Sequence, residues 1–301
     1  MSRREAYFLA DRLMHTGIME LDILGGEPLL IPYMRNFLEY ITGAGFTVHI
    51  STNGSLPELV HTIAKIPNRL LHIGFSLHGF ADIHNVITGS ANFNMVIQCI
   101  RETIFEGGTP IVKSVLTPMN RGEIADLVHY LVELGVKRYF LLHEDIIGRG
   151  EYTEYFSFPA FMKYFSVLRS QFQGILDIGF VAASGFYKYG PHACRRCDAG
   201  ITKLAVLPDG STFPCNLLLG YNEFHLGNIM RDSLDSILSH PVLERFSTSN
   251  TTVCTFSRCA HYTTCSGGCP AHSYSFYRHM EARDPRCQYN DSDWDRADRL
   301  K

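Results

Sequence analysis

Eight of the nine cysteines of this 301-residue chain lie between residues 194 and 287. Thiolates bind zinc and iron–sulfur clusters, and four of them complete either kind of site, so eight suffice for two sites. Zinc ribbons usually contain two close Cys-x2-Cys pairs, and here only Cys194 and Cys197 form one. Spacing alone does not decide between zinc and iron–sulfur clusters. The predicted metal ligands are Cys194, Cys197, Cys215, Cys254, Cys259, Cys265, Cys269 and Cys287.

Composition narrows the class of protein. Hydrophobic residues make up 46% of the chain and charged residues 19%, as in ordinary globular proteins. A net charge of −3 gives no footprint for nucleic acid, and no apolar run approaches the roughly 20 residues of a membrane span. Without a visible signal peptide we predict a cytoplasmic protein with no nucleic-acid or membrane partner. Disulfides are rare there, which favours metal binding by the cysteines.

The elements that must position these residues alternate between two patterns. Short apolar runs predict strands, amphipathic runs predict helices, and glycines past the helices predict C-caps at Gly17, Gly43, Gly107, Gly135 and Gly174. Cys99, in one such helix, is expected to be buried in the core. This order predicts an α/β fold with a helix-covered parallel sheet of near-continuous apolar strands, closing as a full or partial barrel. The expected strands are 19–24, 46–51, 70–77, 110–117, 137–144 and 176–182, and the expected helices lie near 4–15, 31–43, 57–65, 93–106, 121–134 and 159–172.

Three of the predicted strands end in small and polar residues. Any one of these turns could be an ordinary connection, since Gly, Asn, Ser and Pro abound in turns. Ligands of such sheets bind at the carboxyl ends of the strands, however, and three such turns at one pole favour a cofactor pocket. A glycine pair lets the backbone approach a ligand, and Glu27 could accept hydrogen bonds from an ammonium group. The predicted cofactor contacts are Gly25, Gly26, Glu27, Pro28, Ser51, Asn53 and Ser76.

The sequence LGGEPLL resembles the Gly-Gly-Glu-Pro motif of radical S-adenosylmethionine enzymes, and STNG and FSLHG resemble the strand ends that follow it in that family. The cysteine array, with Gly210-x4-Cys215 and then Cys259-x5-Cys265-x3-Cys269, resembles the SPASM extension of the same superfamily. The gap between Cys254 and Cys259 is longer than usual there. The resemblance covers nearly the whole chain. It implies a partial (β/α)6 TIM-like barrel at 1–190 and a small iron–sulfur domain at 191–301.

The resemblance also implies an activity and its cofactors. It implies S-adenosylmethionine, a 5′-deoxyadenosyl radical that takes hydrogen from a peptide or protein, and an external electron donor such as flavodoxin or ferredoxin. Asn216 stands where sulfatase-maturing members carry an Asp after the cluster cysteine, which argues for another peptide modification. Two auxiliary [4Fe-4S] clusters are implied, an inner one on Cys194, Cys197, Cys215 and Cys269 and an outer one on Cys254, Cys259, Cys265 and Cys287.

Two departures from the family leave alternatives open. No cysteine precedes Cys99, so the Cys-x3-Cys-x2-Cys segment of a third [4Fe-4S] cluster and the first barrel strand are missing. The chain is then either truncated, which a helical pattern starting uncapped at Arg3 favours, or a degenerate two-cluster binding or scaffold protein. A zinc-binding α/β protein with a cysteine-rich interaction domain is the third hypothesis. Thr88 also stands where relatives carry an Arg for the methionine carboxylate, and Ser76, Asn53 or a later residue would hold that group.

Overall fold

The computed structural model describes residues 1–67, 69–147, 156–181, 197–247 and 267–287. It contains two compact units. The sheet unit comprises residues 2–143 and 161–181, and the cysteine-rich unit comprises Met1, 144–160 and 182–301. Residues 144–160 thus belong with the later part of the chain, while the predicted domain boundary at 190 and 191 lies outside the described residues.

The sheet unit is built on six parallel strands in sequence order. They are β1 (Glu20–Ile23), β2 (Thr47–Thr52), β3 (Leu71–Ser76), β4 (Ile111–Leu116), β5 (Arg138–His143) and β6 (Asp177–Val181). Every neighbouring pair is parallel, and β1 and β6 form the two edges. All six predicted strands are therefore confirmed, as is the α/β fold class.

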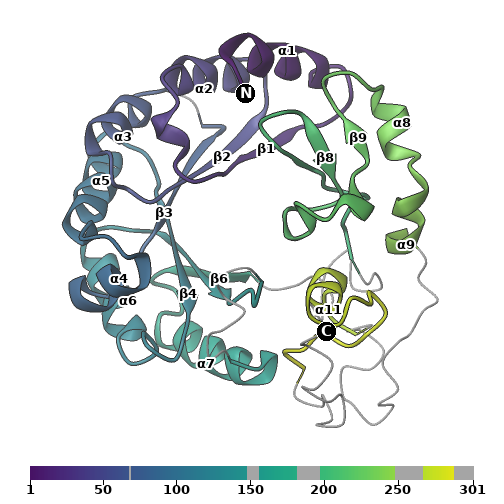
Figure 1. Ribbon diagram of the computed structural model, residues 1–301. Coiled ribbons are helices and arrows are strands. Elements are labelled where there is room, and N and C mark those ends of the chain that lie inside the picture. The colour runs from purple at the N-terminus through teal and green to yellow at the C-terminus, as the bar shows by residue number, and fades with distance from the viewer. Residues whose placement is uncertain (68, 148–155, 182–196, 248–266, 288–301) are drawn as a thin grey trace. The chain divides into compact units, whose positions relative to one another are not determined.

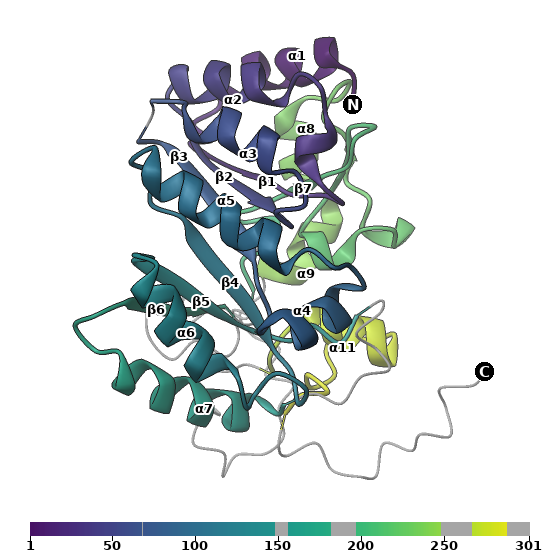
Figure 2. The same ribbon diagram turned by 90° about the vertical axis from the view of Figure 1, so that its left-hand side faces the viewer.

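Helices lie along one face of this sheet (Figures 1 and 2). All of them except α1, which precedes β1, lie between successive strands, as crossovers between parallel strands require. Helix α4 was not predicted, because its sequence ADIHNVIT holds mostly residues of weak helix propensity. The helices are α1 (Arg3–Leu13), α2 (Met34–Gly43), α3 (Pro57–Ala64), α4 (Ala81–Thr88), α5 (Phe93–Phe105), α6 (Ile124–Glu133) and α7 (Phe158–Gln171), with a 3-10 turn, η1, at Pro28–Leu30.

The two faces of the sheet differ in polarity. Along β2, Val48 and Ile50 are fully buried, whereas the alternate residues are partly exposed. Strand β5 alternates in the same way. The expectation of a near-continuous apolar strand is therefore wrong for β2, whose partly exposed positions are the polar Thr47, His49 and Ser51. In β5 the partly exposed positions include the apolar Phe140 and Leu142.

Two details at the helix ends correct the sequence analysis. Ser2 caps α1 in a full capping box with Glu5, whose carboxylate accepts a hydrogen bond from the Ser2 N–H at 2.7 Å. The supposed lack of a cap therefore gives no support to truncation. Gly43 is the last residue of α2, and Gly45, with φ 98°, takes the left-handed position instead. Gly17, Gly107, Gly135 and Gly174 have positive φ as predicted.

In its described residues, the cysteine-rich unit has shorter regular elements than the sheet unit. A small antiparallel sheet pairs β7 (Ala205–Val206), β8 (Ser211–Phe213) and β9 (Gly227–Asn228). No helix among the described residues is long and apolar enough to cross a membrane. The remaining elements are η4 (Asn216–Leu218), η5 (Asn222–Phe224), α8 (Leu234–Leu238), η6 (Pro241–Leu243), α9 (Glu244–Ser247) and α11 (Pro270–Tyr277).

Candidate cofactor sites

The helix-free face of the sheet brings two predicted residues together with a lysine. Ser51 pairs with Gly74, and Ser76 pairs with Lys113, so all four share one face of the parallel sheet. The Lys113 ammonium donates a hydrogen bond to Ser51 Oγ at 2.9 Å. Gly74 leaves room for this lysine, because a Cβ there would lie 3.0 Å from Lys113 Cε. Burial lowers the pKa of Lys113 because it disfavours the charged form, and the Asp22 carboxylate opposes that shift. An anionic ligand beside the ammonium would stabilise its charge in the same way.

Glu27 joins the first two strand ends. It is the N-cap of η1, and its Oε1 accepts hydrogen bonds from the Leu29 N–H at 3.1 Å and the Thr52 hydroxyl at 2.9 Å. Its Oε2 accepts from the Asn53 N–H at 2.8 Å. The carboxylate thus holds the Asn53 turn against the loop after β1. Two carboxylate oxygens offer about four acceptor positions, so an ammonium group could still bind beside these three donors.

The loop that leads to Glu27 is open. A Cβ on Gly25 or Gly26 would meet no atom within 4 Å, and Gly25 has φ 153°. Pro28 is buried as the first residue of η1. This glycine backbone is unobstructed, and it lies next to a carboxylate at the carboxyl end of β1. Such a place suits a ligand with an ammonium group, such as the methionine part of S-adenosylmethionine.

Neighbouring polar residues serve the fold instead. Thr88 donates its hydroxyl hydrogen bond to the His84 carbonyl at 2.8 Å within α4. His84 is fully buried; its Nδ1 accepts from the His78 N–H, and its Nε2 lies 3.1 Å from Asn92 Oδ1. Cys99 is also fully buried and donates to the Gly54 carbonyl at 3.4 Å, which confirms its predicted core role.

Three predicted metal ligands are buried together in the cysteine-rich unit. Cys197, Cys215 and Cys269 have exposed fractions of 6%, 5% and 7%. Burial, together with the charges of the nearby Cys269 and Cys197 thiolates, raises the pKa of the Cys215 thiol to about 12. Thiols that disfavour each other's ionisation in a dry site need a cation among them, and iron supplies that charge when bound.

No three His, Cys, Asp or Glu side chains in the described ranges are placed to hold a single metal ion. The three buried thiols belong to the set assigned to the inner cluster, and their chemistry fits an iron–sulfur group. Cys194, Cys254, Cys259 and Cys265 lie outside the described residues. Cys287 is partly exposed, and its N–H donates to the Asp284 carbonyl at 2.9 Å.

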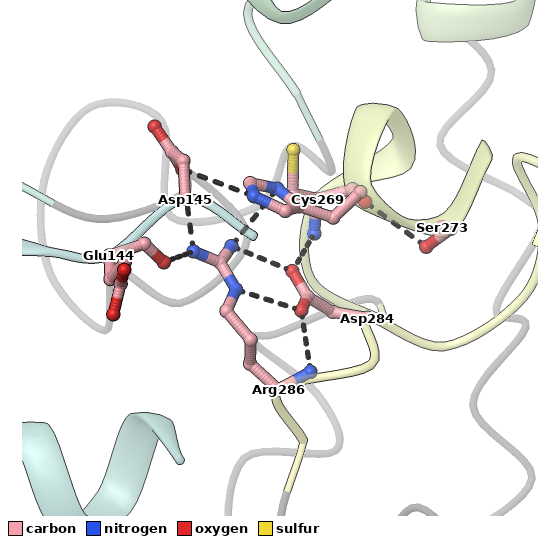
Figure 3. A network of polar contacts seen from close by, with 7 residues as sticks. Glu144, Asp145, Cys269, Ser273, Asp284 and Arg286 are labelled. Carbon is pink, nitrogen blue, oxygen red and sulfur yellow. Dashed lines mark hydrogen bonds and ion pairs between the residues drawn. The ribbon is translucent and has the colours of Figure 1, made fainter. Parts of the chain in front are cut away.

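A buried ion-pair network surrounds Cys269 (Figure 3). The Arg286 side chain, fully buried, makes a bidentate pair with Asp284, with Nε–Oδ1 at 3.0 Å and Nη2–Oδ2 at 2.9 Å. Arg286 also donates to the Glu144 carbonyl at 2.8 Å, and Asp284 Oδ2 accepts from the Cys269 N–H at 3.1 Å. The network therefore connects Cys269 to chain segments before and after it.

His272 also contacts this network. Its Nδ1 lies 3.1 Å from Arg286 Nη2, and its Nε2 lies 3.1 Å from Asp145 Oδ1, without good hydrogen-bond geometry. Burial lowers the pKa of His272, but the Cys269 thiolate and Asp145 outweigh it and raise that pKa to about 9. Burial likewise disfavours the Cys269 thiolate, yet His272 and Arg286 hold the pKa of that thiol below its ordinary value. Cys269 is thus prepared to bind metal.

Sequence reasoning missed Lys113 and Arg286. A signal existed for Lys113, because one charged residue stands inside the apolar run PIVKSVLT. Arg286 had no comparable signal, since its partners at 144 and 145 are about 140 residues away and only the folded chain brings them together.

Residues 191–270 match the model of the SPASM iron–sulfur cluster-binding domain. The chain is 26% identical over 245 residues to the antilisterial bacteriocin subtilosin biosynthesis protein AlbA of Bacillus subtilis, covering 78% of this chain and 52% of that protein. It is 22% identical over 301 residues to the mycofactocin maturase MftC of Mycobacterium ulcerans, covering 95% and 79%. The chain thus spans about half the length of AlbA.

Solved structures share the fold. SuiB of Streptococcus suis bound to S-adenosylmethionine superposes with a TM-score of 0.77 at 19% identity, over 95% of this chain and 70% of that one. SuiB bound to its precursor peptide SuiA gives a TM-score of 0.76 at 17% identity, over 95% and 69%. At these identities the likeness extends to the fold, which agrees with the six-stranded sheet and its helices.

Proposed function

This chain carries a SPASM domain and is related to radical S-adenosylmethionine proteins that modify peptides, and on that premise we propose that it modifies a peptide or protein with the 5′-deoxyadenosyl radical. The observation that carries the proposal is that two features occur in the same chain. One is an open Gly25–Gly26 loop beside Glu27, and the other is a set of buried cysteines that could bind a cluster. Relatives named for bacteriocin biosynthesis and mycofactocin maturation support a ribosomally made precursor peptide as substrate.

We assign roles to this chain's residues in that reaction. Gly25, Gly26, Glu27 and Pro28 would hold the methionine amino group. Lys113 lies beside Ser51 and Ser76 and would hold the methionine carboxylate. It would replace the Arg that relatives carry at the position of Thr88. When bound, a reduced iron–sulfur cluster supplies the electron for S-adenosylmethionine cleavage. An external donor such as flavodoxin or ferredoxin would reduce it.

For the cysteine-rich unit we propose two auxiliary [4Fe-4S] clusters. Cys194, Cys197, Cys215 and Cys269 would hold the inner one, and Cys254, Cys259, Cys265 and Cys287 the outer one. The match to an iron–sulfur domain favours iron over zinc, and the buried Cys197, Cys215 and Cys269 offer thiolate ligands. Iron and sulfide analysis after anaerobic reconstitution tests this, because two such clusters bind about eight of each. Stoichiometric zinc with little iron would contradict it.

The cofactor proposal is tested by S-adenosylmethionine binding to the reconstituted chain in equilibrium dialysis. Lys113→Met keeps the length of the side chain but removes its charge, and we expect at least tenfold weaker binding from the lost charged hydrogen bond. Lys65→Met, at an exposed position, is the matched control and should bind normally. Equal S-adenosylmethionine binding by both variants would show that Lys113 does not contact the cofactor.

Catalysis needs its own test, because residues 1–98 hold no cysteine for the cleaving cluster. The 301-residue chain and a form extended by any residues encoded upstream should be compared for reductive release of 5′-deoxyadenosine. We expect release from the extended form when it contains Cys-x3-Cys-x2-Cys. Two clusters with no S-adenosylmethionine binding in either form would favour the alternative, a two-cluster scaffold protein.

A further inference from the structure

The cysteine-rich unit contains a cavity of about 410 Å³. Two of its lining residues directly follow Cys215, a proposed cluster ligand, so the cavity lies beside the inner cluster position. Its volume is in the range of small ligand sites and would hold one or two amino-acid side chains. Its lining mixes apolar and polar groups, including Asp145, Asn216, Leu217, Tyr221, Ser275 and Arg278.

Arg278 adopts a backbone conformation that suits glycine. It is the C-cap of α11, with φ 57° and ψ 23°, and is the one non-glycine residue with positive φ in the described ranges. Glycine is the residue usually found in this left-handed position after a helix, because a Cβ there costs free energy. An arginine at such a position indicates that its side chain has a use that offsets the strain.

The Arg278 guanidinium is a cation without a carboxylate partner in the described part of the chain. It lies 5.3 Å from the centroid of the Tyr221 ring and 5.8 Å from that of Tyr274, and these rings fix its direction. Asp145, the carboxylate in the cavity lining, is already engaged by His272 at 3.1 Å and Arg286 at 3.4 Å. Asp145 is thereby engaged by other groups, and Arg278 is the positively charged residue of the cavity lining.

We propose that this cavity binds a carboxylate of the peptide substrate, held by Arg278. A guanidinium fixed against aromatic rings presents its planar donors for a bidentate pair with a carboxylate. Leu217 and Tyr221 provide apolar contacts for the atoms next to that group, and Asn216 and Ser275 offer hydrogen bonds. The inference rests on the proposed function in taking the bearer of the carboxylate to be a peptide.

Three capped tripeptides test the ligand chemistry by calorimetry on the reconstituted full chain. They are N-acetyl-Leu-Glu-Leu-amide, N-acetyl-Leu-Gln-Leu-amide, and N-acetyl-Leu-Gln-Leu with a free carboxyl terminus. We expect one of the two acids to bind at least tenfold tighter than the neutral amide. Preference for the first identifies an acidic side chain as the ligand, and preference for the third identifies a peptide C-terminus. Equal binding of all three, or none at millimolar concentration, would overturn the proposal.

Arg278→Gly tests the residue without endangering the fold, because glycine suits the left-handed backbone. It should lose the preference for the acidic tripeptide, at least tenfold, while its unfolding temperature is unchanged or higher. Arg245→Ala is the control, since Arg245 also stacks on an aromatic ring, 5.3 Å from the Phe224 centroid, but does not line the cavity. An unaltered preference in Arg278→Gly would refute the assignment. Neither S-adenosylmethionine nor turnover enters this assay, so its result is separate from that of the proposed function.

Discussion

The two units of this protein hold their polar residues in opposite ways. In the sheet unit, Glu27 accepts hydrogen bonds from neutral donors at the ends of regular strands, and the buried His84 is hydrogen-bonded to neutral groups. In the cysteine-rich unit, fully buried charges meet on segments with little regular structure, and three thiols are buried beside them. From this comparison we expect the first unit to fold on its own packing and the second to depend on the proposed clusters and on its ion pairs.

Metal removal should separate the units most sharply. Cys269→Ser should lose the inner cluster, about four of about eight iron atoms, and the cysteine-rich unit should unfold because structural metal sites supply folding free energy. Iron analysis and hydrogen exchange measure both effects, with β1 to β6 staying protected. Cys99→Ser is the control, since it alters a buried cysteine outside the array and should keep all the iron. Loss of protection in the sheet strands of Cys269→Ser would contradict the independence of the units.

The ion pairs should show the next largest effect. Arg286→Gln leaves the Asp284 carboxylate buried without its bidentate partner, which should lower the free energy of unfolding of the cysteine-rich unit by about 3–5 kcal/mol. Urea unfolding followed by the visible absorbance of the cluster measures this. The double variant Asp284→Asn with Arg286→Gln removes both charges and should be more stable than Arg286→Gln alone. A double variant of lower stability would show that the charge of Asp284 matters elsewhere.

A smaller effect is expected on the stability of the sheet unit when the pH is lowered. Burial, with some repulsion from His84, lowers the pKa of His78 from about 6.5 to about 4. The unfolded chain therefore takes up a proton below about pH 6.5 that the folded chain refuses until about pH 4. Stability of the sheet unit should fall by about 3 kcal/mol as pH falls through this window and stay level above it.

His78→Asn is the variant that isolates this effect. Its amide oxygen can replace His78 Nδ1, which accepts from the Val115 N–H at 3.2 Å, yet it does not titrate. Hydrogen exchange of β3 and β4 at pH 5 and pH 7 compares the two proteins. An equal loss in His78→Asn would assign the acid sensitivity to another group, such as His84.

The sequence predicted the sheet unit well because its signals are local. Apolar runs predicted all six strands, and glycines predicted the ends of four helices. The GGEP and STNG turns marked where Glu27 and Asn53 meet. Helix α4 was missed because local propensity opposes it. The Arg286 network was missed for a different reason, because the pairing of Arg286 with residue 145 depends on tertiary structure 141 residues apart in sequence.

Cys99 gives the sheet unit a built-in chemical reporter. Burial, with a smaller contribution from Glu102, raises the pKa of its thiol to about 12, so almost none of it is a thiolate at neutral pH. Alkylating reagents attack thiolates, and Cys99 should stay unmodified while the unit is folded. The Cys99 thiol donates a hydrogen bond to the Gly54 carbonyl, in the turn that Glu27 holds. The rate at which Cys99 is alkylated would therefore report how often that turn opens in solution.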